Sequence, residues 1–489
     1  MAAASTLLVG CKTASDPSLP PPSSEARLAP RFDRSAPNIV VIETDDQATD
    51  TMGAMVRTRR LLAHHGTTFD NAITSFPLCC PSRASFLTGQ YAHNHGVLDN
   101  SPPNGGIAAL DQSETLAVWL RRAGYRTAFL GKYLNEYGKE KNGGPLFIPP
   151  GWTDWTAFGS SDKTSAYNYS LNRGGRPVDY GNATADYKTA VMSRLAERSL
   201  TKMAADPRPF FFWVTTSDPH LDDSLGPRAR RNPLPYRDDL GLYKGATPPP
   251  VPSFNEKDVS DKSGFVRELD PIDQVGRLAI RRTWVSQLES LVEVDRLVAA
   301  AYGAIADAGE LRRTLIVFTS DNGFLRGQHR IDSGKSSIFE EALKVPLIIA
   351  GPGFEGASRR ESTIVSNVDL SATILHAAGV RAPIKTDGIP IQRTLERGHR
   401  SPILLEIYGR KDGDLFGVRS QRYTYAEHSD GFVELYDLEK DPYELSNVAE
   451  RRPYRTVQAA LQRRLDALRS CAGATCRNLP RRQSIRRPG

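Results

Sequence analysis

Short apolar runs alternate along the chain with longer segments whose apolar positions recur at helical spacing. The apolar runs span residues 38–43, 126–130, 209–215, 314–319 and 345–350, and the helical patterns span 113–123, 187–205, 276–308 and 370–378. Continuous apolar runs are typical of parallel strands that are buried on both faces. The alternation therefore predicts an α/β fold with a mostly parallel central sheet flanked by helices.

From residue 400 onward the pattern changes. Short strand signals at 402–407, 416–419, 423–426 and 431–436 precede a helical pattern at 453–469. Consecutive short strands predict a smaller C-terminal antiparallel subdomain. Between the two parts of the main sheet, residues 221–275 are rich in Pro, Asp and Gly with little periodicity, and we expect them to form a long insertion that shapes a pocket.

Two of the predicted strands are followed by acidic or amide residues. Asp45 and Asp46 follow the first strand, and Asp321 and Asn322 follow the strand at 314–319. Either segment alone fits a strand followed by a polar turn. Ligands of open α/β sheets lie beyond the carboxyl ends of the strands. Three carboxylates and an amide together predict an oxygen-rich site for a hard cation such as Ca²⁺.

The most informative segment is the run CCPSRASFLTG at residues 79–89. Taken alone, two adjacent cysteines before a proline also fit a buried pair at the start of a helix, where proline is favoured. The spacing of Cys79, Pro81 and Arg83, followed by Leu-Thr-Gly, resembles the sulfatase pattern in which a cysteine becomes formylglycine. Cys80 occupies a variable position of that pattern, and we expect it to be a packed neighbour.

Together with the two acid-ended strands, this run resembles the type I sulfatases of the alkaline-phosphatase-like superfamily. The resemblance extends from about residue 37 to 450. Further matching elements are Gly131-Lys132, Asp218-Pro219-His220, Gly327-Gln328-His329, Gly334-Lys335 and the C-terminal segment 434–447. It implies a catalytic domain at 37–399, a C-terminal subdomain at 400–470 and a tail at 471–489.

Several short motifs resemble one branch of these sulfatases, the N-acetylglucosamine-6-sulfatases and heparan endosulfatases. They are LCCPSR at 78–83, HNH at 93–95, GKYLNEY at 131–137, PPGW at 149–152 and YNY at 167–169. This resemblance implies a sulfated saccharide as substrate, such as a glucosamine 6-sulfate unit, although a small aryl sulfate stays open.

The resemblance implies a mechanism. A formylglycine-generating enzyme oxidises Cys79, and the aldehyde hydrates to a diol. Ca²⁺ is held by Asp45, Asp46, Asp321 and Asn322 together with the modified Cys79. One hydroxyl of the diol attacks sulfur, the sugar alcohol leaves, and the second hydroxyl loses its proton to expel sulfate.

The resemblance also implies roles for other side chains. Arg83 steadies the oxygens on the metal side, and Lys132 and Lys335 contact the sulfate. His220 is the candidate general acid for the leaving alcohol, and His329 is a further candidate. Any one of these residues alone would fit a solvated lysine or a structural histidine.

One position departs from the usual pattern. Many sulfatases carry a histidine two residues after the Gly-Lys lysine, where it helps to eliminate sulfate, but this chain has Leu134 there, followed by Asn135. The branch named above shares this departure. The base for elimination stays open among Lys132, His329 and water.

Two other functions stay open from the sequence. One is a phosphodiesterase or phosphonate monoester hydrolase of the same superfamily, which would use the same formylglycine. The other is a non-catalytic protein that binds sulfated glycans through an unconverted Cys79.

Charge and cysteine usage bear on partners and compartment. The 489 residues carry 63 Lys and Arg against 56 Asp and Glu, a net charge of +7 that suits an anionic substrate. A nucleic-acid partner would need a clustered basic stripe, and we expect no nucleic-acid partner. No run approaches the roughly 20 apolar residues of a membrane span. Cys471 and Cys476 fit a small disulfide loop in an exported protein, or two thiols in a reducing cytosol.

The N-terminal segment resembles part of a lipoprotein signal. Residues 8–11, Leu-Val-Gly-Cys, resemble a lipobox that would lipidate Cys11, and residues 12–36, rich in Pro, Ser and Ala, read as a flexible linker. A basic n-region is missing, so either the true start lies upstream or the match is chance. We expect an exported protein, extracellular or tethered to a membrane surface through Cys11.

Overall fold

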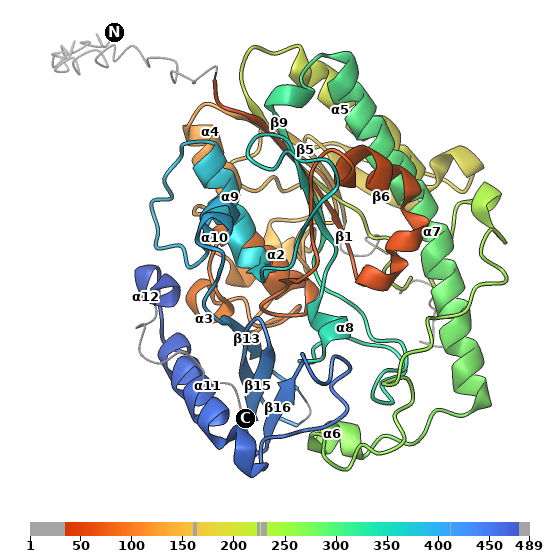
Figure 1. The fold of residues 1–489 in the computed structure, drawn as a ribbon. Coiled ribbons are helices and arrows are strands. Elements are labelled where there is room, and N and C mark those ends of the chain that lie inside the picture. The colour runs from red at the N-terminus through yellow and green to blue at the C-terminus, as the bar shows by residue number, and fades with distance from the viewer. Residues whose placement is uncertain (1–34, 160–163, 223–224, 226–231, 411, 479–489) are drawn as a thin grey trace, which may run out of the picture.

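The computed structural model describes residues 35–159, 164–222, 225, 232–410 and 412–478. Cys11, most of the expected linker at 12–36 and the end of the expected tail lie outside these ranges. A ten-stranded sheet forms the centre of the molecule, with the strand order β11-β2-β10-β9-β1-β8-β4-β5-β6-β7 (Figure 1). Its strands are β1 (Asn38–Thr44), β2 (Thr67–Phe69), β4 (Arg126–Gly131), β5 (Asp154–Phe158), β6 (Tyr169–Arg173), β7 (Pro177–Tyr180), β8 (Phe210–Thr215), β9 (Thr314–Ser320), β10 (Leu347–Ala350) and β11 (Arg359–Glu361).

The middle of this sheet is parallel. Strand β1 pairs in parallel with β8 and β9, and β4 pairs in parallel with β8 and β5. Antiparallel pairs appear toward the edges, where β10 joins β9 and β6 joins β5. The predicted parallel core is confirmed, and the apolar run at 345–350 corresponds to the antiparallel β10.

Helices cover both faces of the sheet. Successive residues of a strand point to opposite sides, so a continuous apolar strand presents apolar side chains on both faces. Ile39 and Val41 pack in one hydrophobic core with α2 (Cys79–Thr88), α4 (Leu116–Arg122), α9 (Asn367–Ala377) and α10 (Ile391–Arg397). Val40 and Ile42 pack in another core with α5 (Lys188–Ala204) and α7 (Gln274–Asp307). Figure 1 shows α5 and α7 side by side on the opposite side of the sheet from α2 and α9. Burial on both faces explains why the strands read as continuous apolar runs.

The C-terminal part forms a second, four-stranded sheet. It contains β13 (Ile403–Ile407), β14 (Leu415–Arg419), β15 (Tyr423–His428) and β16 (Val433–Asp437), which pair antiparallel in sequence order. Helix α11 (Arg455–Leu468) and the short α8 (Glu340–Leu343) contribute to its core. The predicted antiparallel subdomain is confirmed; the expected domain boundaries stay predictions.

The remaining elements are short. They are the two-stranded pair of β3 (Ala72–Ile73) and β12 (Val365–Ser366), and the helices α1 (Val56–Thr58), α3 (Ala92–His95), α6 (Gly264–Arg267) and α12 (Ala474–Arg477). Within the described ranges, none of the helices combines the length and the apolar character that a membrane crossing requires.

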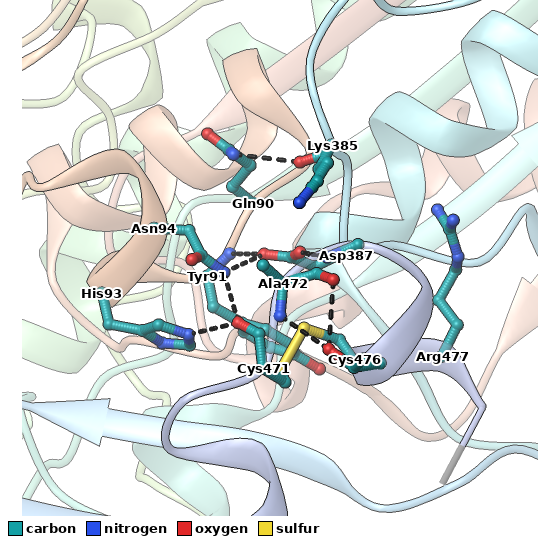
Figure 2. The surroundings of a disulfide bond; sticks show 12 residues. Gln90, Tyr91, His93, Asn94, Lys385, Asp387, Cys471, Ala472, Cys476 and Arg477 are labelled. Carbon is teal, nitrogen blue, oxygen red and sulfur yellow. Dashed lines mark hydrogen bonds between the residues drawn. A yellow bond between two sulfur atoms is a disulfide. The ribbon is translucent and has the colours of Figure 1, made fainter.

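A disulfide joins Cys471 to Cys476 beyond the end of α11 (Figure 2). The loop that it closes is fixed to α3, since the carbonyl of Cys471 accepts hydrogen bonds from Asn94 Nδ2 at 2.9 Å and lies 2.8 Å from His93 Nε2. Asp387 Oδ1 accepts from the amide of Gly473 at 2.6 Å. The first residues of the expected tail are therefore packed against the main body.

Candidate active site

Four oxygen-bearing side chains meet at the carboxyl end of the sheet. Thr44 of β1 lies in register with Ser320 of β9, so the residues that follow the two strands are neighbours in space. The amide of Asp46 donates to Asp321 Oδ1 at 3.2 Å, and Asn322 Nδ2 donates to Asp46 Oδ1 at 2.7 Å. The structure thus brings together Asp45, Asp46, Asp321 and Asn322, all fully or almost fully buried.

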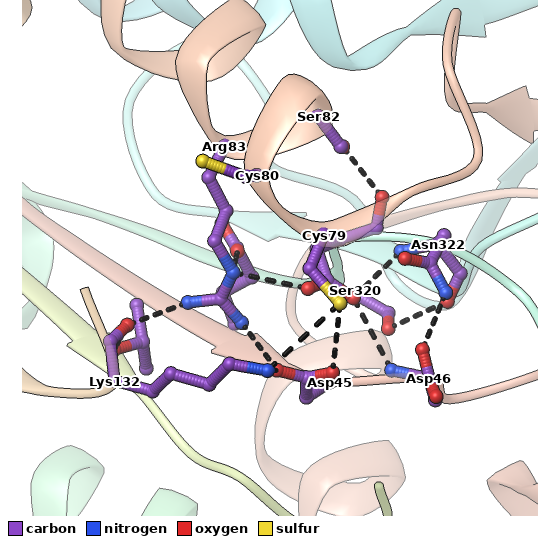
Figure 3. Close-up of polar contacts among 12 residues, drawn as sticks. Asp45, Asp46, Cys79, Cys80, Ser82, Arg83, Lys132, Ser320 and Asn322 are labelled. Carbon is purple, nitrogen blue, oxygen red and sulfur yellow. Dashed lines mark hydrogen bonds and ion pairs between the residues drawn. The ribbon is translucent and has the colours of Figure 1, made fainter. Parts of the chain in front are cut away.

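Cys79 is the first residue of α2 and points at this group (Figure 3). Its Sγ lies 3.5 Å from Asp45 Oδ1. The helix is held in place by Ser82, whose Oγ donates to the carbonyl of Asp321 at 2.5 Å. Cys80 points away into the hydrophobic core. Only Cys79 of the two adjacent cysteines reaches the polar cluster.

Arg83 lies one turn along α2 and is completely buried. Its Nε donates to Asp321 Oδ2 and its Nη2 to Asp45 Oδ2, both at 3.0 Å, while Nη1 donates to the carbonyl of Lys132 at 2.6 Å. The planar guanidinium therefore joins three segments of the site. The carboxylates of Asp45 and Asp321 are thereby held close together by one buried cation.

Two lysines converge on Cys79 from different elements. Lys335 Nζ lies 2.8 Å from Cys79 Sγ, and Lys132 Nζ, just after β4, lies 3.8 Å from the same sulfur. Each ammonium also forms an ion pair with a strand-end carboxylate, Lys132 with Asp45 and Lys335 with Asp46. These contacts place two positive charges beside residue 79.

His220 approaches the same carboxylates from the loop after β8. Its Nε2 lies 3.6 Å from Asp46 Oδ2 and 4.0 Å from Asp45 Oδ1. Its Nδ1 lies 2.6 Å from the carbonyl oxygen of Leu221, a contact in which Nδ1 carries the proton. This fixed ring orientation leaves Nε2 directed at the cluster.

The electrostatics of the cluster follow from burial and close charges. Burial and the charge of Asp45 raise the pKa of the unmodified Cys79 thiol to about 12. Burial alone would raise the pKa of Asp45, but Lys132, His220 and Arg83 hold it well below its usual range. Burial and Asp45 raise the pKa of Asp321. These opposing shifts show that the buried carboxylates depend on nearby positive charge, which a bound cation also supplies.

The donor set fits a metal ion. Ligand atoms of Asp45, Asp46, Cys79 and His220 all lie within 4.8 Å of one another. Asn322 Oδ1 is buried and has no hydrogen-bond partner among the described residues, although a buried amide oxygen normally has one. Asp46 Oδ1 accepts a hydrogen bond from Asn322 Nδ2 at 2.7 Å and forms an ion pair with Lys335. Carboxylate and amide oxygens are the ligands that Ca²⁺ prefers.

Comparison with known proteins identifies the family. The sulfatase family model matches residues 37–380, and the model described as N-sulphoglucosamine sulphohydrolase, C-terminal, matches residues 327–471. The chain belongs to the sulfatase family. It is therefore a sulfuric ester hydrolase, and members of this family generally use a metal ion and a formylglycine residue.

Curated relatives carry related names. The human N-acetylglucosamine-6-sulfatase is 30% identical over 494 residues, which are 90% of this chain and 86% of the human one. The Drosophila melanogaster extracellular sulfatase SULF-1 homolog is 34% identical over 407 residues, which are 78% of this chain. This sulfatase spans only 35% of the length of that SULF-1 homolog.

Solved structures share the fold. A protein in complex with its substrate D-glucosamine-2-N,6-O-disulfate superposes with a TM-score of 0.75 at 22% identity, over 88% of this chain and 97% of that one. The phosphonate monoester hydrolase of Agrobacterium radiobacter superposes with a TM-score of 0.66 at 21% identity, over 88% and 95% of the two chains.

His329 contacts a different group of residues from the polar cluster around Cys79 in this sulfatase. The histidine is completely buried, its Nδ1 lies 2.6 Å from Glu256 Oε2, and its ring stacks on Phe339 with centroids 3.7 Å apart. Its Nε2 faces a second group of carboxylates, those of Glu341 and Glu444. The interpretation of His329 as a catalytic group therefore loses its geometric basis, because the local motif did not show which way the ring points.

The position that lacks the usual histidine is apolar in space as well as in sequence. Leu134 is buried in the hydrophobic core shared with α4. The side-chain oxygen of Asn135 is buried without a partner among the described residues, and none of its contacts reaches the carboxylates. Of the candidate bases for sulfate elimination, Lys132 is the one that lies beside Cys79.

Other residues of the site were missed by the sequence analysis. Glu43, the sixth residue of β1, lies 3.5 Å from Arg83 Nε and accepts from Trp213 Nε1 at 3.3 Å. Glu43 could have been noticed in the sequence, because a carboxylate inside an otherwise apolar strand is unusual. A cavity that adjoins Asp46, His220 and Lys335 is lined partly by the C-terminal sheet, through Arg410, Asp412, His428 and Glu434. Glu434 begins the C-terminal segment that matched the family pattern, but nothing in the sequence indicated that it lines a cavity, and no motif marked the other three.

Proposed function

We propose that this sulfatase hydrolyses 6-sulfate esters of glucosamine units in sulfated glycans, with a formylglycine made from Cys79. The observation that carries the proposal is the meeting of Cys79, two lysines and His220 around Asp45 and Asp46, next to a cavity that Asp46, His220 and Lys335 line. The names of the relatives support the choice of sugar, since N-acetylglucosamine-6-sulfatases cover most of this chain.

The modified residue and the metal each supply one kind of chemistry. A hydrated formylglycine supplies a hydroxyl nucleophile, together with a second hydroxyl from which the sulfate can later be eliminated. A divalent cation, which we propose to be Ca²⁺ held by Asp45, Asp46, Asp321 and Asn322, supplies Lewis-acid polarisation of a sulfate oxygen.

The side chains of the chain provide binding and proton transfer. Lys335 and Lys132, both within 4 Å of Cys79 Sγ, hold the sulfate beside residue 79 and offset the charge that grows on its oxygens. The amide groups at the start of α2 favour the same anion. Arg83 keeps Asp45 and Asp321 in place, so that the anion meets a fixed environment.

His220 is the proposed general acid. With Nδ1 bound to the carbonyl of Leu221, a proton carried by Nε2 faces the carboxylates of Asp45 and Asp46, which lie 3.6 to 4.0 Å away. That proton is available to the sugar oxygen as the S–O bond breaks. The sequence motif pointed to His220 as the general acid, and the orientation of its ring indicates Nε2 as the atom that donates the proton.

We also propose that the protein is exported. The Cys471–Cys476 disulfide supports this, because such bonds persist in oxidising compartments. Maturation by a formylglycine-generating enzyme and a tether through lipidated Cys11 belong to the same proposal. Mass analysis of the N-terminal peptide from membrane fractions tests the tether; an unlipidated N-terminus in the soluble extracellular fraction would exclude it.

The experiment that tests the function is release of free sulfate from a panel of sulfated saccharides. We expect the largest kcat/KM on substrates with a glucosamine 6-sulfate and a much smaller value on phenylphosphonate. A larger kcat/KM on phenylphosphonate would instead assign the chain to phosphonate hydrolysis. An unmodified thiol at Cys79, from a host that contains the maturation enzyme, would leave only sulfated-glycan binding.

A further inference from the structure

A second group of side chains with metal-binding atoms is formed by residues other than those around Cys79. A ring nitrogen of His329 and carboxylate oxygens of Glu341 and Glu444 lie within 4.8 Å of one another. The three residues come from the loop after β9, from α8 and from the segment after β16. His329 and Glu444 are at most 1% exposed, and Glu341 is partly exposed. The group therefore joins the loop after β9 and α8 to the C-terminal part of the chain.

Two atoms of this group are buried without a partner. His329 Nε2 and Glu444 Oε1 form no hydrogen bond with any of the described residues. Buried nitrogen and oxygen atoms of side chains normally have such a partner, because they lose their contacts with water on burial. Both atoms belong to the same three side chains, so one ion among them would satisfy the two together.

The ring of His329 is held by Glu256 at its other nitrogen. Nδ1 lies 2.6 Å from Glu256 Oε2, a contact in which Nδ1 carries the proton, and Glu256 Oε1 lies 3.3 Å from Nζ of the buried Lys262. The lone pair of the ring is then on Nε2. A carboxylate at the far nitrogen is the usual support of a metal-bound histidine, because it fixes the tautomer and makes the ligand nitrogen more basic.

The two carboxylates accept from neutral donors and keep lone pairs for a further ligand. Glu341 Oε1 accepts from Ser253 Oγ at 3.2 Å, and Glu444 Oε2 accepts from the amide of Glu340 at 2.8 Å. The guanidinium of Arg419 pairs with the side chain of Glu340 instead.

A shared proton does not explain the arrangement. It would need a hydrogen bond between Nε2 of His329 and a carboxylate of Glu341 or Glu444, and Nε2 has no such bond within the described part of the chain. Two carboxylates and a neutral imidazole together carry the charge that one divalent cation neutralises.

The kinds of ligand atom indicate the kind of ion. One imidazole nitrogen with two carboxylate oxygens is suited to Zn²⁺ and related first-row dications, whereas Ca²⁺ takes oxygen ligands. Ligand atoms around one zinc ion lie about 3–3.5 Å apart, so the three side chains would close by about 1 Å on binding. Three protein ligands leave the fourth position of a tetrahedral ion to water.

We infer that His329, Glu341 and Glu444 form a second metal site, which takes Zn²⁺ or a related first-row dication, with Glu256 as its positioning residue. The ion is structural. His329 and Glu341 flank the segment that carries Lys335, so the ion holds both ends of that segment to the C-terminal part. The inference goes beyond the proposed function and does not depend on it, because none of the three ligands takes part in the proposed hydrolysis.

Metal content tests the inference. The protein is produced with Ca²⁺ and Zn²⁺ in the medium, desalted and analysed for both elements. We expect about one Zn²⁺ per chain, and Glu341→Gln and Glu444→Gln should each weaken Zn²⁺ binding by about tenfold or more while Ca²⁺ stays. Asp46→Asn should lower the Ca²⁺ content and leave this Zn²⁺ in place. Because Glu341 is partly exposed, its variant should fold even if the Glu444 variant does not.

Glu439→Gln is the matched control. Glu439 lies on the same segment after β16 but is 56% exposed and paired with Arg422, so the variant should keep the wild-type Zn²⁺ content. Added Zn²⁺ should raise the Tm of the wild-type protein and of this control, and should not raise the Tm of the two ligand variants.

Two results would overturn the inference. One is a wild-type protein that retains no Zn²⁺, in which case a buried water accounts for the two unpartnered atoms. The other is Zn²⁺ that is lost in Asp46→Asn and kept in Glu341→Gln and Glu444→Gln, which would place the ion at the strand-end carboxylates. Neither result bears on the release of sulfate, so the proposed function is judged separately.

Discussion

Lys335 Nζ lies 2.8 Å from Cys79 Sγ, although 256 residues separate the two in the chain. Cys79 begins α2, and Lys335 lies in the loop that leads to α8. The contact places a cation directly over the residue that we propose as the nucleophile. It also shows that the site is assembled from segments that lie far apart in the sequence.

Replacement of Cys79 by Ala should abolish sulfate release, with kcat reduced on the order of 10⁴-fold or more, because the covalent route is lost. The measurement is turnover of a sulfated saccharide together with the intact mass of the purified variant. Cys80→Ala is the control: Cys80 lies in the hydrophobic core, so it should cost stability and leave the mass of a modified Cys79 in place. Full turnover by Cys79→Ala would contradict the assignment.

Replacement of His220 by Ala should lower kcat more for substrates with poor leaving groups than for substrates with good ones. A sugar alkoxide needs the proton of Nε2 as it leaves, whereas a nitrophenolate does not. We therefore expect kcat on a sugar sulfate to fall by about 10²–10⁴-fold and kcat on 4-nitrophenyl sulfate to fall much less. Equal losses on both substrates would show that His220 binds the sulfate or the carboxylates instead of donating a proton.

Removal of the metal should weaken both the fold and the activity. Asp45, Asp46 and Asp321 are buried close together, and a bound cation offsets the part of their mutual repulsion that their ion pairs with Lys132, Lys335 and Arg83 do not. We expect chelation to lower the Tm and to stop sulfate release, and added Ca²⁺ to restore both, with about one ion bound per chain.

Asp46→Asn should reduce the bound metal, while Asp206→Asn, on the surface beside Arg208, should not. The metal assignment would be refuted if the chelated protein, shown to contain no bound metal, had an unchanged Tm and still released sulfate.

Replacement of Arg83 by Met should lower the free energy of unfolding by about 3–5 kcal/mol, because Asp45 and Asp321 lose their buried partner. Urea denaturation measures this loss. Arg208→Met removes an exposed ion pair with Asp206 and should cost at most about 1 kcal/mol. Similar small losses in both variants would mean that Arg83 contributes little to the stability of the site.

The attachment of the disulfide loop should depend on pH through His93. Burial lowers the pKa of His93, but the hydrogen bond to Glu406 at 2.9 Å, the charge of Glu406 and the carbonyl of Cys471 raise it above the ordinary value of 6.5. A histidine whose folded pKa is raised stabilises the fold fully below its unfolded pKa, and this stability is lost as the pH rises through the folded pKa.

The measurement is the difference in Tm between the wild-type protein and His93→Gln across pH 5–9. We expect the difference to be largest on the acidic side of the range and to shrink as the pH rises above 6.5. A difference that grows with rising pH would reverse the sign and exclude an imidazolium at this contact.

Much of the fold could be predicted from the sequence, because the positions of the central strands depend on the local pattern of apolar residues. The strands at 38–44 and 314–320 are buried at every position and mostly apolar, since both faces of each are covered by helices, and such runs stand out in a sequence. The antiparallel pairing of β10 was not readable, because strand direction depends on how the chain returns to the sheet, which no short segment records.

By itself, the sequence predicted most of the residues that the structure brings together at the proposed active site. Cys79 with Pro81 and Arg83, and the acidic residues after two strands, are local signals, because each functional group sits at a fixed offset from the start of a helix or the end of a strand. The sheet then brings them together through the parallel register of β1 and β9.

The tertiary structure alone decided the surroundings of that chemistry. It directed His329 toward Glu256, and it placed Asp412, in the loop between β13 and β14, and Glu434 of β16 in the wall of the cavity that Asp46, His220 and Lys335 also line. Side-chain direction and contacts between distant elements depend on packing across the whole molecule, and packing leaves no fixed spacing in the chain.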